Sequence, residues 1–143
     1  MIVVDASVWV SRLVPDDVHH RASRLWLEQA VYRGEPLISP AILLAEIAGA
    51  VSRRTGEASL AERAVRNVLR IPGVRLVSID RRLAREAARL AARLRLRGAD
   101  AVYAATASLM RIPLVTWDSE QHSRAGALVS VRTPAIDDSA PRS

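Results

Sequence analysis

Residues 1–7 read Met1-Ile2-Val3-Val4-Asp5-Ala6-Ser7, a continuous apolar run that stops at an acidic residue. A run that is apolar at every position, rather than at alternate ones, is typical of a strand buried on both faces. Strands of this kind occur in parallel sheets that are covered by helices. The run therefore predicts an α/β fold, and Asp5 then stands at the carboxyl end of a strand, where such folds bind ligands.

The rest of the chain alternates short apolar runs with longer helical stretches. We predict further strands at 36–39, 74–79, 113–117 and 128–132, and helices at 6–14, 16–33, 40–54, 57–70, 80–97, 99–110 and 119–125. In this assignment Gly98 separates two helices, and right-handed crossovers join the strands into a parallel sheet of four to five strands with helices on both faces. We assign residues 1–133 to this single domain and 134–143 to a flexible C-terminal tail.

Composition narrows the function classes. The 143 residues suit one domain, and half of them are hydrophobic, which is enough for a core. No apolar run approaches the ~20 residues of a membrane helix, so we expect a cytoplasmic protein. Without cysteine, disulfides and thiolate sites are excluded, and three scattered histidines, expected at the surface, argue against a zinc site. The net charge of +6 favours either a polyanionic partner or simple solubility.

Two acidic residues directly follow predicted strands. Asp5 ends the first strand, and Asp118 comes just after the strand at 113–117. The carboxyl ends of parallel strands meet at one edge of the sheet, so the two carboxylates are expected there together. Each also has a structural interpretation, because aspartate is a favoured N-cap and helical sequence follows both.

Two further acids are the only charges on apolar helical stretches. Glu46 stands alone among apolar residues from Pro40 to Val51, and Asp100 is isolated in the same way between Arg97 and Arg111. A buried carboxylate needs a cation or strong donors. The alternatives are a buried salt bridge to an arginine for Glu46 and a helix cap for Asp100.

Taken together, four isolated carboxylates without a histidine cluster suit a hard cation, Mg²⁺ or Mn²⁺. Two hydroxyl side chains, Ser7 and Thr116, each lie two residues from one of the acids. We expect these hydroxyls to orient the carboxylates by hydrogen bonding.

The acids sit in four recognisable motifs: Asp5-x-Ser7; Leu44-Ala45-Glu46-Ile47; Arg97-Gly98-Ala99-Asp100-Ala101-Val102-Tyr103-Ala104-Ala105-Thr106-Ala107; and Leu114-Val115-Thr116-Trp117-Asp118. In this order, and on this pattern of elements, the chain resembles the PIN-domain ribonucleases, most closely the VapC-type toxins of toxin–antitoxin pairs. The resemblance extends over residues 3–131. It implies that Asp5, Glu46, Asp100 and Asp118 form a catalytic site for one or two Mg²⁺ or Mn²⁺ ions. It also implies RNA hydrolysis by metal-activated water, a VapB-like antitoxin and a homodimer.

Surface residues give weaker signals. Arg12, Arg53 and Arg54 are closest in sequence to the predicted catalytic elements, and we expect them to contact RNA phosphates. A second set of arginines recurs at helical spacing and is interpreted as a solvated face: Arg82, Arg85, Arg89, Arg93 and Arg97. Trp9 and Trp26 lie on apolar helical faces, where we expect core or dimer contacts. The first two helices nevertheless carry more apolar residues than one side of a sheet needs. We therefore expect an exposed apolar groove between these helices and the helix at 40–54, where an antitoxin helix docks.

Three other functions remain open at this stage: a housekeeping PIN nuclease, a metal phosphohydrolase of small esters, and a non-catalytic RNA- or protein-binding module. The chain lacks a second aspartate two residues after Asp5, which argues against an aspartyl-phosphate mechanism. Testing RNA and a chromogenic phosphate ester as substrates distinguishes a ribonuclease from the phosphohydrolase and from the non-catalytic binding module.

Overall fold

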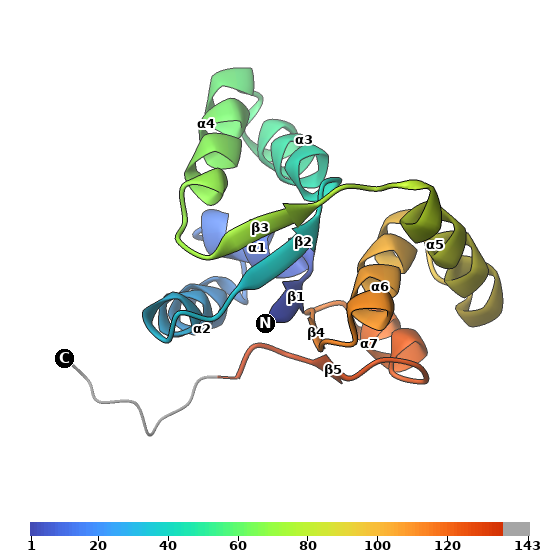
Figure 1. Ribbon diagram of the computed structural model, residues 1–143. Helices are drawn as coiled ribbons and strands as arrows, with labels where there is room; N and C mark the ends of the chain where they lie inside the picture. The colour runs from blue at the N-terminus through green and yellow to red at the C-terminus, as the bar shows by residue number, and fades with distance from the viewer. Residues whose placement is uncertain (136–143) are drawn as a thin grey trace.

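The computed structural model describes residues 1–135, which form five strands and seven helices (Figure 1). In chain order the elements are β1 Ile2–Val4, α1 Ala6–Leu13, α2 His20–Tyr32, β2 Leu37–Pro40, α3 Leu43–Thr55, α4 Ala58–Leu69, β3 Val74–Val77, α5 Arg81–Leu94, α6 Gly98–Met110, β4 Leu114–Val115, α7 Ser119–Ala125 and β5 Val131–Arg132. Residues 136–143, most of the tail predicted at 134–143, lie outside the described residues.

The strands form one parallel sheet with the order β3-β2-β1-β4-β5. The first strand lies in the middle, where Val3 and Val4 are completely buried. It pairs with β2 on one side and with β4 on the other, with Val4 opposite Val115. This confirms the predicted α/β fold and the strand buried on both faces. It also makes the segments after β1 and β4 neighbours at the carboxyl edge.

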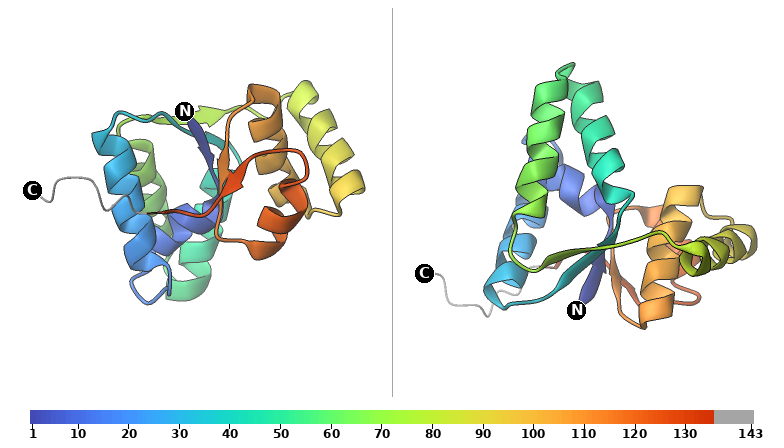
Figure 2. Two further views of the ribbon diagram at one scale, coloured as in Figure 1. Left: turned by 90° about the horizontal axis from the view of Figure 1, so that it is seen from below. Right: turned by 45° about the horizontal axis from the view of Figure 1, so that its top comes forward.

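Helices cover both faces of the sheet, as predicted. The first four, α1–α4, gather on one side and α5–α7 on the other (Figure 1 and Figure 2). On the second side, α6 packs on β1, β2 and β4, and its buried face consists largely of alanines. Small side chains allow close approach of the helix to the sheet, so α6 brings its first turn near the ends of β1 and β4.

Trp9 belongs to the core. Its side chain is fully buried, and its indole N–H donates to Ser39 Oγ at 3.3 Å, while Ser39 in turn donates to the carbonyl of Val4 at 2.7 Å. The expectation of a core position for Trp9 is therefore confirmed, and Trp9 does not contribute to an exposed apolar face. A buried indole with a hydrogen-bond partner anchors α1 to β1 and β2 instead.

Several predicted element boundaries shift. The helix predicted at 80–97 ends at Leu94, because Arg95 takes a left-handed conformation with φ 54°. Gly98 is consequently the first residue of α6 and does not end the preceding helix. Arg97 is therefore outside α5, and the predicted stripe of arginines on one helix stops at Arg93.

Two more corrections concern polar and proline residues. The helix predicted from Asp16 begins only at His20, since Asp17 accepts a hydrogen bond from the His19 N–H and closes a local turn. Pro40 ends β2 and does not open α3. Of the helices in residues 1–135, none has the length and apolarity needed to cross a membrane.

Candidate active site

The structure brings the four predicted acids to the carboxyl edge of the sheet. Asp5 follows β1, Asp118 follows β4, and Glu46 and Asp100 lie in the first turns of α3 and α6. Each carboxylate is close enough to at least two of the others for their charges to interact. Like charges this close raise one another's pKa values, so the group as a whole favours a cation.

Asp5 is the most deeply buried of the four, at 4% exposure. Its Oδ2 accepts hydrogen bonds from the backbone N–H of Ser7 at 2.9 Å and from the hydroxyl of Thr116 at 3.1 Å. Burial raises the pKa of Asp5; the hydrogen bonds from Ser7 and Thr116 oppose this, and the charge of Asp118 adds to it. The result is a buried carboxyl group held in one orientation.

Thr116 links the ends of the two central strands. Besides donating to Asp5, its hydroxyl accepts from the backbone N–H of Asp118 at 3.0 Å. The hydroxyl of Ser7 lies 3.3 Å from Thr116 Oγ1 and accepts from the Trp117 N–H at 3.0 Å. Thr116 thus orients Asp5 by the kind of hydrogen bond predicted from the sequence. Ser7 acts on Asp5 through both its backbone N–H and its side chain, and its hydroxyl also accepts from the segment that carries Asp118.

Glu46 has a partner that the sequence alternatives did not include. The Tyr103 hydroxyl donates to Glu46 Oε2 at 2.6 Å, so the buried salt bridge to an arginine was wrong. Burial raises the pKa of Glu46, the hydrogen bond from Tyr103 lowers it, and the charges of Asp5 and Asp100 raise it further. The same contact, together with burial, raises the pKa of Tyr103 far above its usual value, so the phenol stays a donor.

Asp100 and Asp118 share one arginine. Arg97 donates from Nε to Asp100 Oδ2 and from Nη2 to Asp118 Oδ2, both at 3.2 Å. The pKa of Asp100 is raised by burial and by the charges of Asp5 and Asp118, while Arg97 lowers it. The N-cap of α6 is Arg97, so the alternative of Asp100 as a helix cap was wrong.

The interpretation as helix N-caps is confirmed for Asp5 and Asp118, the two acids that follow strands. Each carboxylate can still accept further hydrogen bonds or ion pairs. Asp5 is the N-cap of α1, and Asp118 caps α7 through Oδ1, which accepts from the Gln121 N–H at 2.7 Å. The other oxygen of Asp118 is the one that meets Arg97. Each residue therefore fixes a helix while its carboxylate still faces the other acids.

Sequence reasoning missed three residues of this site. Tyr103 lies one helical turn after Asp100, a spacing that could have indicated a shared face. Gln121 is fully buried and ties α7 to α6 through the carbonyl of Asp100 at 3.1 Å. His19 is not a simple surface residue: its ring stacks on Trp117 with centroids 3.9 Å apart. Neither Gln121 nor His19 had a local sequence signal, because both contacts join distant segments.

A groove runs from the acids between α1 and α3, where the apolar docking groove was predicted. It has a volume of about 470 Å³ and is lined by Val10, Ile42, Ala45, Glu46, Ala50 and Arg53, among others. Of the three arginines expected to contact RNA, only Arg53 lines this groove. Arg54 pairs with Asp17 at 3.9 Å, and Arg12 lines a separate apolar cavity beside α2.

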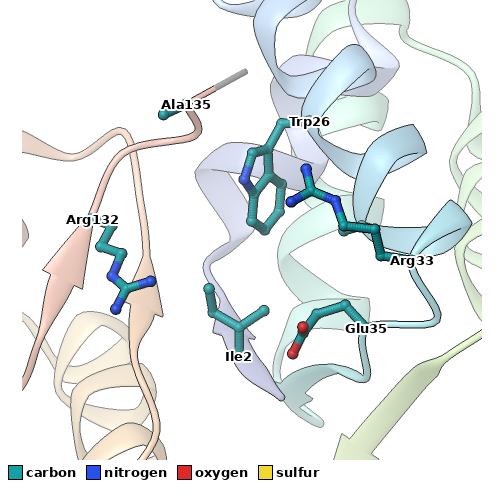
Figure 3. Close-up of a pocket in the computed structure, with 7 residues that line it drawn as sticks. Ile2, Trp26, Arg33, Glu35, Arg132 and Ala135 are labelled. Atoms are coloured by element: carbon teal, nitrogen blue, oxygen red, sulfur yellow. The ribbon is translucent and has the colours of Figure 1, made fainter. Parts of the chain in front are cut away.

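A second hollow lies at the opposite end of the sheet, where β1 begins. It is lined by Ile2, Trp26, Arg33, Glu35, Arg132 and Ala135 (Figure 3). Glu35 also pairs with the amino group of Met1. This cavity is separated from the four acids by the length of the central strand and takes no part in their chemistry.

The donor set fits a hard divalent cation. It consists of carboxylates that lie close to one another, and the most buried of them, Asp5, forms no ion pair within residues 1–135. As the side chains lie, no three acidic or histidine groups of residues 1–135 enclose an ion position. Oδ2 of Asp100 and Oδ2 of Asp118 face Arg97, so their use as ligands requires this contact to be exchanged, whereas Tyr103 engages only one oxygen of Glu46.

Comparison with known proteins supports the assignment made from the motifs. The PIN domain, as a sequence family, matches residues 2–127. No curated protein matches the sequence. The family match covers all four acids and every element from β1 to α7.

Several solved structures have the same fold. FitAcB from Neisseria gonorrhoeae is 25% identical, with a TM-score of 0.74 over 94% of this chain and 98% of that chain. The VapC20 toxin of Mycobacterium tuberculosis, which cleaves the sarcin–ricin loop, is 21% identical, with a TM-score of 0.72 over 92% and 99%. A toxin–antitoxin complex from Klebsiella pneumoniae is 17% identical, with a TM-score of 0.66 over 96% and 100%. The resemblance inferred from the motifs is thereby confirmed, and the chain belongs to the PIN-domain family.

Proposed function

We propose that this protein is an endoribonuclease that depends on Mg²⁺ or Mn²⁺ and acts as the toxin of a type II toxin–antitoxin pair. The observation that carries the proposal is the convergence of Asp5, Glu46, Asp100 and Asp118 at one edge of the sheet, where burial and the neighbouring acidic charges raise the pKa values of Asp5, Glu46 and Asp100. Such a cluster destabilises the protein unless a cation binds it, which is typical of a metal site and not of structural acids.

The chain's own residues provide orientation and charge. A divalent cation, when bound, supplies activation of the attacking water and neutralisation of charge at the phosphate. Thr116 and the Ser7 N–H hold Asp5, Tyr103 holds Glu46, and Asp118 is fixed by its cap on α7. These constraints present carboxylate oxygens in fixed directions, which metal-assisted hydrolysis requires. Arg53, in the adjoining groove, is positioned to hold an RNA phosphate.

The toxin assignment rests on the likeness to the VapC20 toxin and to the Klebsiella toxin–antitoxin complex, together with the groove between α1 and α3. Most of the residues that line this groove are apolar, and its charged residues are Glu46 and Arg53. An antitoxin helix with an apolar face and a basic side chain at one end is the complementary partner. Such a partner covers the site and neutralises its charge at the same time.

The test is cleavage of RNA by the purified protein. We expect cutting of single-stranded or loop RNA in Mg²⁺ or Mn²⁺, none in EDTA, and loss of cutting in Asp100→Asn with a melting temperature close to that of the wild type. The matched control is Asp16→Asn, which changes an exposed acid outside the site and leaves cutting unchanged. Hydrolysis of bis-p-nitrophenyl phosphate without RNA cleavage indicates a small-ester phosphohydrolase. RNA binding without any hydrolysis indicates a binding module.

A further inference from the structure

Within residues 1–135, Arg97 is the one basic residue whose side chain forms an ion pair with any of the four carboxylates, and it pairs with two of them. Its guanidinium bridges Asp100 and Asp118, using Nε for one and Nη2 for the other at 3.2 Å each. The forked guanidinium group suits this arrangement because its donors point in parallel toward two acceptors. Arg97 therefore supplies half of the acid cluster with its counterion.

The loop before α6 fixes Arg97 in this place. The left-handed backbone of Arg95 ends α5. The next residue, Leu96, is buried in a hydrophobic cluster that α5 and α6 mainly form and that also contains Leu90. Arg97 then serves as the N-cap residue of α6, three residues before Asp100. The inward turn of Leu96 directs the next side chain to the opposite side, toward the acids.

The contact is suited to exchange. The side chain of Arg97 is 71% exposed, whereas those of Asp100 and Asp118 are 19% and 27% exposed. Ion pairs that remain open to solvent are weak, so a guanidinium held in this way leaves readily. The two carboxylates stay behind in the site, because one sits in the first turn of α6 and the other caps α7.

We propose that Arg97 is a built-in competitor for the metal: it neutralises Asp100 and Asp118 in the metal-free protein and must leave them when a divalent cation binds. This rests on the proposed metal-dependent function. The oxygens that Arg97 contacts, Oδ2 of both residues, are oxygens that a cation in the cluster needs as ligands. Arg97 thereby lowers the metal affinity of the site and stabilises the protein without metal.

The experiment is titration calorimetry with Mn²⁺ alone, without RNA, on four proteins: the wild type, Arg97→Gln, Arg85→Gln and Asp5→Asn. We expect Arg97→Gln to bind Mn²⁺ about three- to ten-fold more tightly than the wild type, as follows from the loss of two weak ion pairs. Arg85 is an exposed arginine on α5 with no ion pair among the described residues, so Arg85→Gln removes the same charge and should leave the affinity unchanged. Melting in EDTA verifies that all four proteins are folded.

Two results contradict the proposal that Arg97 competes with the metal. One is equal or weaker Mn²⁺ binding by Arg97→Gln; the other is an equal gain in Arg85→Gln, which assigns the effect to net charge. In either case the proposed metal site survives if the wild type binds Mn²⁺ and Asp5→Asn does not. Absence of Mn²⁺ binding in both the wild type and Arg97→Gln overturns the competition and the metal site together.

Discussion

Asp5 shows how one residue combines structure and chemistry at a cost in stability. It is 4% exposed, caps α1, and accepts two hydrogen bonds, yet burial still raises its pKa above the usual 3.8. Burial is also the main cause of the raised pKa values of Glu46 and Asp100. In the absence of metal, ionising these groups therefore works against folding.

The sign of this coupling gives the first prediction. A carboxyl whose pKa is higher in the folded protein than in the unfolded chain retains its proton longer when folded. Its contribution to stability is complete below its ordinary pKa, 3.8 for Asp5, and is lost as the pH rises through the raised value. In EDTA we expect the free energy of unfolding, measured with urea, to fall over this range, and to fall less steeply in Asp5→Asn. Asp16→Asn, at an exposed site, should follow the wild type; identical slopes in Asp5→Asn contradict the burial argument.

Tyr103 carries the second prediction. Its hydroxyl lowers the pKa of Glu46, so Tyr103→Phe should raise that pKa and move the acid limb of the rate–pH profile of RNA cleavage to higher pH. Activity then falls more at acid pH than at alkaline pH. Loss of one hydrogen bond to a carboxylate also costs about 1–2 kcal/mol of stability. Tyr32→Phe is the matched control, because Tyr32 is 87% exposed. A uniform loss across all pH values argues against a role through Glu46.

At the scale of the element, helix caps and site acids are the same residues. Asp118 caps α7 through Oδ1, and α7 is further held to α6 by the buried Gln121. The helix therefore positions the acid, and the acid begins the helix. The two roles can be separated by substitution, because a cap needs an oxygen acceptor and a metal ligand needs the negative charge.

Asp118→Asn and Asp118→Ala provide the third prediction. Asparagine retains the acceptor for the Gln121 N–H, so the free energy of unfolding in EDTA should stay close to that of the wild type. Alanine loses the cap and should cost about 1 kcal/mol. Both substitutions should weaken Mn²⁺ binding in calorimetry. If the alanine variant alone weakens it, Asp118 acts on the site only by ordering α7.

Elements whose signals are local were predictable. The apolar run at β1, the caps Asp5 and Asp118, and the helix at 119–125 can all be derived from neighbouring residues. The break after α5 was placed at Gly98, since glycine is the usual residue for such a turn; the structure uses Arg95, which has no such signature. The partner of Glu46 was missed because Tyr103 is 57 residues away in sequence. Long-range side-chain pairs depend on packing that periodicity does not encode.

At the scale of the whole molecule, an acidic site lies within a basic protein. The net charge is +6, whereas the carboxyl edge of the sheet carries four acids bridged, within residues 1–135, by Arg97 alone. In the function that we propose, the positive charge attracts RNA from a distance, and the acids repel its phosphates locally until a divalent cation neutralises them. The proposed function therefore requires both the cation and the protein's own arginines.

The groove between α1 and α3 links this charge arrangement to control of activity, and it carries the last prediction. Ala50 lines the groove one helical turn after Glu46. A bulky charged residue there should block an antitoxin helix without altering the four acids. We expect expression of the wild type to slow bacterial growth, and co-expression of a cognate antitoxin to restore it. Ala50→Arg should remain toxic but resist this rescue, whereas Ala58→Arg, an exposed change on α4, should be rescued like the wild type.

The same assay distinguishes a toxin from a housekeeping enzyme. Toxicity that arises from RNA cleavage has to disappear in Asp5→Asn, because this substitution removes the central carboxylate while its amide oxygen still accepts the hydrogen bonds from Ser7 and Thr116. If the wild type and Asp5→Asn are equally harmless, the site acts on RNA without harming the host, and no antitoxin is needed to cover the groove. In that case a housekeeping PIN nuclease is the better account, and the apolar lining of Val10, Ile42 and Ala45 must face another partner.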